Sequence, residues 1–286
     1  MIAPLVALYL SVVADGPAPP LKPTSKWIVD FAPARCEARR NYGTDEQPLL
    51  LVLKSPPLGN AIQIAVIRVG RQTEMAEQLD GEVAFDDRPP LKTSFLTYTR
   101  KQQQRRIYLA NLPMDDFAPA KVAKVLSIRA SRTPSQQDPP AGSRLVSALK
   151  TYEINERLAV SGMATLIKVM EDCVADLRNV WNVTEGSGTS RLKQRVQGDL
   201  RGVIQSDDYP GVAIVKGQSG SVTLALLVDE KGRVADCTVI ETSGAASLDA
   251  QSCAILTARA RLTPAVGLDG KPAKGSFLQR ITWRAM

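Results

Sequence analysis

The chain has 286 residues, of which 44% are hydrophobic, with 36 Lys and Arg against 29 Asp and Glu and no histidine. This length suits two domains, and the hydrophobic fraction is ordinary for packed cores. The net charge of +7 would suit nucleic acid, but the basic residues are scattered and the aromatic fraction of 5% is too low for base stacking, which excludes nucleic acid as a partner.

The first 14 residues are apolar. They are too few to span a bilayer, which takes about 20 residues. They resemble the apolar core of a signal peptide with a cleavage site at Ala14, although the usual positive charges before it are missing. A buried N-terminal strand is the alternative. We expect residues 1–20 to be a signal peptide and leader, the protein to be exported to the periplasm, and no later stretch to span a membrane.

Residues 21–184 are expected to form a β-rich N-terminal domain of unknown type. Alternating apolar residues and turn signals predict its strands. These strands span residues 27–31, 49–53, 61–69, 94–98, 106–109 and 145–158. Asn41, Tyr42 and Gly43 indicate a turn, and the proline-rich residues 131–142 indicate a surface loop. Strands at this spacing are typical of a sandwich or a barrel-like sheet.

A long helix is predicted after Gly162, because apolar residues recur there at steps of three and four. They are Met163, Leu166, Ile167, Met170, Val174, Leu177 and Trp181. Such a stripe packs against a sheet far more often than it faces a cofactor, so we expect it to form core. Residues 185–190 are Gly/Ser-rich and predict a linker, and residues 191–202 predict a short polar helix.

The C-terminal domain, residues 191–286, is expected to contain a three-stranded antiparallel sheet with one helix. Period-two apolar patterns predict strands over residues 221–229, 233–241 and 276–283. A helix is predicted from Leu248 to about Leu262, with Ser247 as N-cap, ending before Pro264. With the β-rich domain before it, the fold class is α+β.

The four cysteines fall two in each predicted domain. No Cys-x-x-Cys pair or histidine is present, so a metal site is not expected. We favour the disulfides Cys36–Cys173 and Cys237–Cys253, given export. The other two connectivities, and four buried free thiols, remain open.

Catalytic motifs are missing from the sequence. Without histidine there is no imidazole base, and no phosphate loop or dinucleotide fingerprint occurs. The acidic pairs at 86–87, 115–116 and 207–208 lie beside turn residues, which favours solvated turns and caps over acid–base partners. We therefore expect no enzyme, no catalytic residues and no cofactor.

The last quarter to third of the chain resembles the C-terminal domain of the TonB family. The order and spacing of its turn residues carry this resemblance, since each is a weak signal alone. The matching residues are Tyr209, Pro210, Gly220, Ser221, Val222, Asp229, Gly232, Val234, Ser243, Gly244, Leu248, Asp249, Pro264, Ala265, Gly270 and Pro272. Leu262 departs from the family, which often has an aromatic residue at that position.

The resemblance implies a periplasmic domain that binds outer-membrane receptors or transporters by adding a strand to its sheet edge, linked to TonB-dependent transport. Energised members of that family also have a transmembrane helix, a functional histidine and a long proline-rich spacer. This chain shows none of these. The resemblance therefore implies a binding module on an exported adaptor and puts energy transduction in doubt.

The final strand is the expected partner-binding edge. It comprises Phe277, Leu278, Gln279, Arg280, Ile281, Thr282 and Trp283. Its odd-numbered and its even-numbered residues should lie on opposite faces, so that one of the two faces can pack on the helix. The alternative is an edge protected by the charges of Lys274, Arg280 and Arg284.

Two functions of different classes follow. The first is a non-catalytic interaction module of the cell envelope. The second is a periplasmic ligand sensor or enzyme that acts through residues 21–182, with the C-terminal domain as a tether. A polar pocket within the first domain would favour the second function, and a fully packed sheet the first. The partner and the oligomeric state are left open.

Overall fold

The computed structural model describes residues 18–70, 76–100, 105–132, 152–183 and 191–285. The N-terminal strands are β1 Ile28–Phe31, β2 Cys36–Gly43, β3 Pro48–Ser55, β4 Ala61–Val69, β5 Glu77–Phe85, β6 Leu91–Arg100, β7 Arg105–Pro113, β8 Val125–Ser131 and β9 Tyr152–Ala159. The C-terminal strands are β10 Leu192–Gln194, β11 Gly220–Val228, β12 Val234–Glu241, β13 Ala265–Gly267, β14 Pro272–Ala273 and β15 Gly275–Trp283. The helices are α1 Met114–Phe117, α2 Met163–Val180, α3 Gly211–Val215 and α4 Ala246–Arg259.

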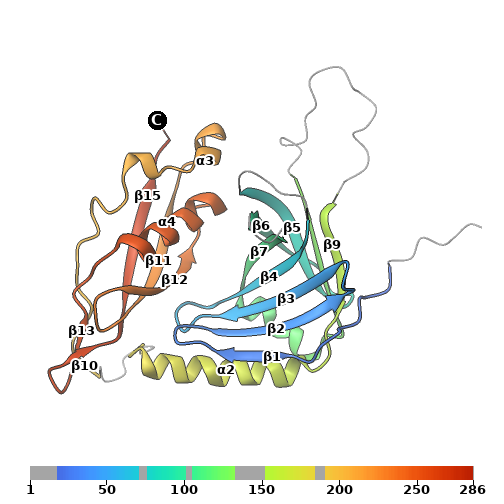
Figure 1. Ribbon diagram of the computed structural model, residues 1–286, viewed down its shortest axis with the longest axis horizontal. Helices are drawn as coiled ribbons and strands as arrows, with labels where there is room; N and C mark the ends of the chain where they lie inside the picture. Colours follow the sequence, from blue (N-terminus) through green and yellow to red (C-terminus); the bar gives the residue numbers. More distant parts are fainter. Residues whose placement is uncertain (1–17, 71–75, 101–104, 133–151, 184–190, 286) are drawn as a thin grey trace, which may run out of the picture.

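The nine N-terminal strands form one antiparallel sheet in the order β1-β2-β3-β4-β7-β6-β5-β8-β9, which curls strongly (Figure 1). A short segment before β1 joins the two ends of the sheet. The amide of Leu21 donates to the Arg157 carbonyl on β9, and the amide of Thr24 donates to the Asn41 carbonyl on β2. The sheet thus closes on itself, the barrel-like form of the two that the sequence suggested.

The inner face of the curled sheet is filled with side chains. Alternate residues such as Leu51, Leu53, Ile64 and Phe95 are almost completely buried there. Helix α2 runs along the lower side of the sheet in Figure 1 and buries its predicted stripe against it. Strand β2 and helix α2 are joined by the disulfide Cys36–Cys173, as expected.

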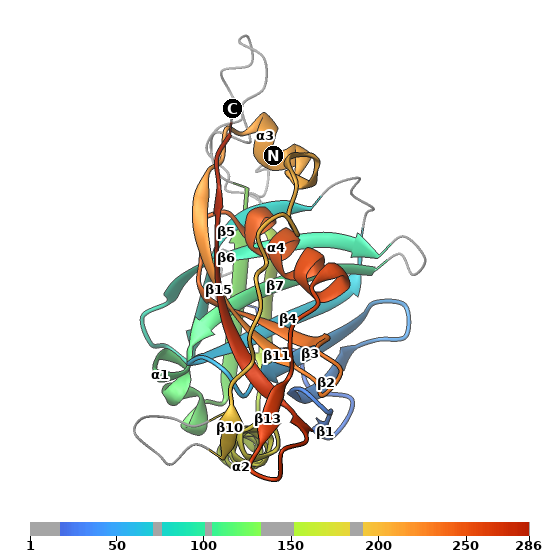
Figure 2. The same ribbon diagram turned by 90° about the vertical axis from the view of Figure 1, so that its left-hand side faces the viewer.

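The C-terminal unit, residues 191–285, packs around a second core. Its main sheet has the strand order β12-β11-β15, and α4 covers one face of it (Figure 2). The disulfide Cys237–Cys253 ties β12 to α4, which confirms the second expected pairing. A smaller sheet, β10-β13-β14, extends the unit at its lower end. The α+β fold class is therefore confirmed.

The structure corrects several expected elements. Residues 191–202 contain strand β10 in place of the expected helix, because Leu192 and Gln194 pair with β13. Residues 41–43 end strand β2 in place of the expected turn, and only Gly43, at φ +81°, begins to turn the chain. Strands β2, β5, β8, β13 and β14 were not predicted.

Helix α4 also differs from its expected bounds. It begins at Ala246, with Ala245 rather than Ser247 as N-cap, and ends at Arg259 rather than near Leu262. The amide of Leu262 instead donates to the Gly232 carbonyl, so the chain is already extended there. The expected signal peptide, linker 185–190, and most of the loop 131–142 lie outside the described residues, as does the first half of the strand expected over 145–158.

The N-terminal unit, residues 18–183, and the C-terminal unit contact each other directly. Leu227 of β11 belongs to the hydrophobic cluster of the first unit. Arg35 forms an ion pair with Asp236 on β12, with 3.3 Å between Nη1 and Oδ1. The Gln78 side chain accepts a hydrogen bond from the amide of Ala246 at the start of α4. These contacts place β12 and α4 against the outer wall of the curled sheet.

Candidate partner-binding site

Strand β15 forms one edge of the main C-terminal sheet. It pairs along its whole length with β11, from Gly220 opposite Trp283 to Val228 opposite Gly275, and it stands last in the strand order of the described residues. Its exposure alternates as predicted. The side chains of Leu278, Arg280 and Thr282 are exposed, Leu278 by 68%, whereas those of Phe277 and Ile281 pack against the helix side.

The end of β15 is held firmly in place. Trp283 is 4% exposed, and its indole Nε1 donates to Oγ of Ser252 on α4 at 2.8 Å. The ring of Tyr209 packs edge-on against Trp283 with 5.2 Å between centroids. A rigid edge loses little conformational freedom when another strand pairs with it, which favours binding.

The outward-facing backbone groups of β15 can be assigned from one hydrogen bond. Nε2 of Gln279 donates to the carbonyl of Arg280 at 2.7 Å. Since β11 occupies the other side, this carbonyl points to the open edge, and the amide of the same residue points the same way in an antiparallel strand. Leu278 and Thr282 share this direction by the period of two, so the outward amides and carbonyls of the edge belong to Leu278, Arg280 and Thr282.

The edge is only partly protected by charge. The ammonium of Lys274 lies over the Trp181 ring at 5.0 Å from its centroid, and its carbonyl accepts a hydrogen bond from Asn182. Lys274 therefore contributes to the contact between the units rather than to the edge. Arg280 and Arg284 are exposed.

The comparison with protein families bears on this unit. Residues 205–285 match the model of the Gram-negative bacterial TonB protein C-terminal domain. The match confirms the resemblance and covers α3, α4, β11 to β15 and the loops between them, which is less than a third of the chain. Comparisons with curated proteins and with solved structures gave no significant match.

The matched TonB C-terminal family consists of interaction domains that bind outer-membrane receptors and have no catalytic activity. The match and the two disulfides together point to the periplasm or cell envelope. Within the described residues, no helix is both long and apolar enough to cross a bilayer.

One group of TonB-type motif residues builds the turn between β11 and β12. Oδ1 of Asp229 accepts hydrogen bonds from the amides of Lys231 and Arg233, at 2.9 and 2.8 Å. Gly232 has φ +74°, and a Cβ there would lie 1.9 Å from the Leu262 carbonyl oxygen. Only glycine fits this position, which explains the D-x-x-G pattern.

A second group of motif residues joins β12 to α4. The carboxylate of Asp249 accepts hydrogen bonds from the Thr242 hydroxyl and the Ser243 amide. Gly244 has φ +85°, and Leu248 is fully buried. A Cβ on Gly220 would lie 2.2 Å from the carbonyl oxygen of Ser243, so the start of β11 packs tightly against this loop.

The remaining motif residues are spread over the unit. Pro210 is the N-cap of α3, and Pro264 directly precedes β13. The family motif residues therefore do not converge on one site. They fix turns and packing within the unit.

The acidic pairs lie in a turn and in short helical turns, in line with the predicted turns and caps. Asp86, at φ +52°, accepts hydrogen bonds from the amides of Lys124 and Val125. Asp115 accepts one from the Asn60 side chain at the start of α1. Asp208 forms an ion pair with Arg259, with 2.7 Å between Oδ2 and Nη1, and this contact holds the pKa of its carboxyl below the ordinary value.

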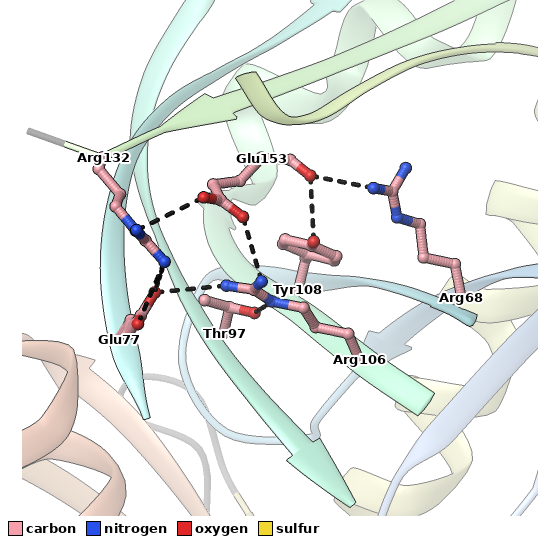
Figure 3. Close-up of polar contacts among 7 residues, drawn as sticks. All are labelled: Arg68, Glu77, Thr97, Arg106, Tyr108, Arg132 and Glu153. Carbon is pink, nitrogen blue, oxygen red and sulfur yellow. Dashed lines mark hydrogen bonds and ion pairs between the residues drawn. The ribbon is translucent and has the colours of Figure 1, made fainter. Parts of the chain in front are cut away.

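A charged cluster that the sequence did not reveal fills one end of the curled sheet (Figure 3). Arg106, whose side chain is 6% exposed, binds the carboxylates of Glu77 and Glu153 at 3.3 and 3.1 Å and the hydroxyl of Thr97 at 2.9 Å. Arg132 contacts both carboxylates as well. The charges are paired within the cluster, which favours a structural plug over a reactive centre.

The backbone explains how these groups meet. The pairing of β8 with β9 shifts register at Ala130 and Ser131, which leaves Glu153 as an extra residue that can turn inward. Its carbonyl accepts hydrogen bonds from Tyr108 and Arg68. Burial raises the pKa of the Tyr108 hydroxyl. Arg106 lies in phase with the buried Tyr108 and Ala110 along β7, which is the one sequence signal that could have revealed the cluster.

Proposed function

We propose that this protein is a non-catalytic interaction module of the cell envelope, whose TonB-like unit binds an extended segment of an outer-membrane receptor or transporter at the edge of β15. The single observation that carries the proposal is the open edge of β15 in a unit that matches the TonB C-terminal family. Export and a role in TonB-dependent transport are part of the proposal.

Strand addition suits this edge chemically. An incoming peptide would pair with the outward amides and carbonyls of Leu278, Arg280 and Thr282, each hydrogen bond contributing about 1 kcal/mol. Affinity would come from the backbone, and the exposed side chains would add selectivity. The Gln279 side chain, which now covers one carbonyl, can rotate away when the partner binds.

The alternative of a sensor or enzyme acting through residues 21–182 has one observation in its favour, a pocket of about 270 Å³ within the first unit with Thr24, Asn41 and Asp45 in its lining. The inner face of the curled sheet is filled by the hydrophobic core, and its charged end is internally paired. These features suit a folded scaffold that presents or positions the C-terminal unit.

The test compares two substitutions at one residue. Arg280→Pro removes the outward amide, while Arg280→Ala removes the same charge and keeps the amide. A photo-crosslinking amino acid at Leu278 should capture outer-membrane receptor or transporter segments from intact envelopes, identified by mass spectrometry. We expect capture to fall about tenfold in the proline variant and to change little in the alanine variant.

Circular dichroism and thermal unfolding must first show that both variants remain folded. Gln279→Pro serves as the opposite control, because its amide points to β11 and its loss should destabilise the sheet. Equal capture by folded Arg280→Pro and Arg280→Ala proteins would contradict strand addition at β15.

A further inference from the structure

A cavity of about 420 Å³ lies between the two units. One wall is formed by β12 and α4, and the other by residues of the curled sheet, among them Gln63 on β4 and Asn111 on β7. These two residues pair across the strands, and their neighbours Ile62, Ile64, Ala110 and Leu112 are buried inside the sheet. Gln63 and Asn111 therefore project from its outer face toward the C-terminal unit.

The cavity runs along the unpaired edge of β12. Four consecutive residues, Asp236 to Val239, line it. Successive side chains of a strand point to opposite faces of its sheet, so all four can border one cavity only if it follows the edge of the strand. In the strand order of the described residues β12 is terminal, with β11 on its other side. Its outward amides and carbonyls thus face the cavity.

The charges around the cavity are already paired. Arg35 binds Asp236, Lys54 lies 3.8 Å from Glu37, and Asp249 accepts two hydrogen bonds from the preceding loop. Burial raises the pKa of Asp236, so this environment disfavours further charge. A ligand of this cavity should therefore be uncharged.

The opposite wall offers neutral hydrogen-bonding groups. Nε2 of Gln63 donates to Oδ1 of Asn111 at 3.1 Å. The remaining groups of this pair, the Gln63 carbonyl oxygen and the Asn111 amide nitrogen, have no hydrogen-bond partner among the described residues. On the wall formed by β12 and α4, the small residues Ala246 and Ala250 of α4 leave room for the side chains of a ligand.

We propose that this cavity binds an extended, uncharged peptide segment with small side chains, which adds to the edge of β12 through backbone hydrogen bonds. The four lining residues of β12 match about 13 Å of extended chain at the usual rise of 3.3 Å per residue. The side chains of the segment would alternate between α4 and the amide wall of the curled sheet. This site is separate from β15, and its existence does not depend on the function proposed for that edge.

The probe is the blocked hexapeptide acetyl-Ala-Thr-Ala-Thr-Ala-Thr-amide, titrated into the ¹⁵N-labelled full chain. We expect saturable chemical-shift changes at the amides of residues 236–239. The same peptide methylated at every backbone nitrogen should cause none, because its backbone can no longer donate hydrogen bonds to β12. Equal shifts with the methylated peptide would overturn the proposal, as would no saturable shift up to about 10 mM peptide.

Two variants block the cavity from opposite walls. Ala250→Trp fills it from α4 and Gln63→Trp from β4, and each should weaken binding at least tenfold. Ala258→Trp is the matched control, since Ala258 is exposed on the same helix and does not line the cavity. If one blocking variant unfolds, the other decides. Retained binding in a folded blocking variant, or shifts confined to β15, would overturn the proposal. Shifts confined to β15 would support only the function proposed for that edge.

Discussion

The two main sheets of this protein differ in how their edge strands are paired. In the N-terminal unit, residues 21–24 join the ends of the sheet, α2 packs along it, and a charged cluster fills one end. In the C-terminal unit, β15 remains open, and β12 faces a cavity. Within the described residues, the first sheet is joined at its ends, whereas the main C-terminal sheet leaves two edges without a strand partner. Both proposed binding sites use the main C-terminal sheet, and we expect the larger N-terminal sheet to contribute most to stability.

The largest effect should come from removing the disulfide of the larger sheet. Cys36 and Cys173 are 137 residues apart, so their bridge restricts the unfolded chain strongly. The double substitution Cys36→Ala/Cys173→Ala should lower the free energy of unfolding by about 5 kcal/mol. Denaturant unfolding followed by circular dichroism measures this change. A smaller decrease in the free energy of unfolding than the one caused by removing the second disulfide would contradict the assignment of stability to the N-terminal unit.

Removing the second disulfide should have a smaller effect on stability. Cys237 and Cys253 are 16 residues apart, and loss of their bridge should lower the free energy of unfolding by about 3 kcal/mol. Denaturant unfolding of Cys237→Ala/Cys253→Ala gives the value. If the units unfold independently, as the predicted boundary at 185–190 implies, only the C-terminal transition should shift. A matching shift of both transitions would show that the units unfold together.

Alkaline pH should weaken the N-terminal unit. Burial raises the pKa of Tyr42 to about 12, against an ordinary value of 10.0, although the Arg40 charge opposes the shift. The neutral hydroxyl is thus favoured in the folded state, and its contribution, up to about 3 kcal/mol, is complete below pH 10 and lost as the pH rises toward 12. Tyr42→Phe should flatten this slope in denaturant titrations. Parallel slopes for the two proteins would exclude this role.

Gly232, in the turn between β11 and β12, and Gly270, in the turn between β13 and β14, form a matched pair of glycines at positive φ. Gly232→Ala should lower the free energy of unfolding by about 2 kcal/mol or more, because the residue has a positive φ and its new Cβ would clash with the Leu262 carbonyl. Gly270 has a similar φ of +77° but nothing within 4 Å of a new Cβ, so Gly270→Ala should cost only about 1 kcal/mol. Thermal unfolding of the two variants gives the difference. Equal losses would show that the close contact is unimportant.

The smallest effect concerns the ion pair between the units. Burial raises the pKa of Asp236 more than Arg35 lowers it, so the ionised form is penalised in the fold. The contribution of this group is complete below the ordinary pKa of an aspartate and is lost as the pH rises. At pH 7, Asp236→Asn should change the free energy of unfolding by less than about 1 kcal/mol, with no loss of stability. A clear loss at pH 7 would mean that the ion pair itself holds the units together.

Local chemistry made the C-terminal unit predictable. Asp229, Gly232 and Gly244 fix turns through contacts within a few residues or through a positive φ, and such signals are visible in a sequence. The cysteine pairing followed from placing two cysteines in each domain. The alternation along β15 followed from the period of the strand, although the sequence cannot say that no further strand covers it.

Features set by distant residues were missed. Leu192, Val196 and Leu200 are four residues apart, which imitates a helix, but this segment is extended because β13 pairs with it. Tyr42 belongs to a turn-prone tripeptide, yet it is buried inside β2. The cavity beside β12 is formed where the two units pack together, and no local sequence pattern predicts how they pack.

The segment that joins the ends of the larger sheet also constrains the order in which the molecule can assemble. Leu21 bonds to the last strand of that sheet, and Cys36 bonds to the helix that follows it. Neither contact can form until most of the N-terminal unit has been made. Such distant contacts slow folding, because a long loop must close before any of them contributes. Leu21 must therefore wait for its partner on β9, whereas the hairpins between consecutive strands, such as β1 with β2 and β2 with β3, can form at once.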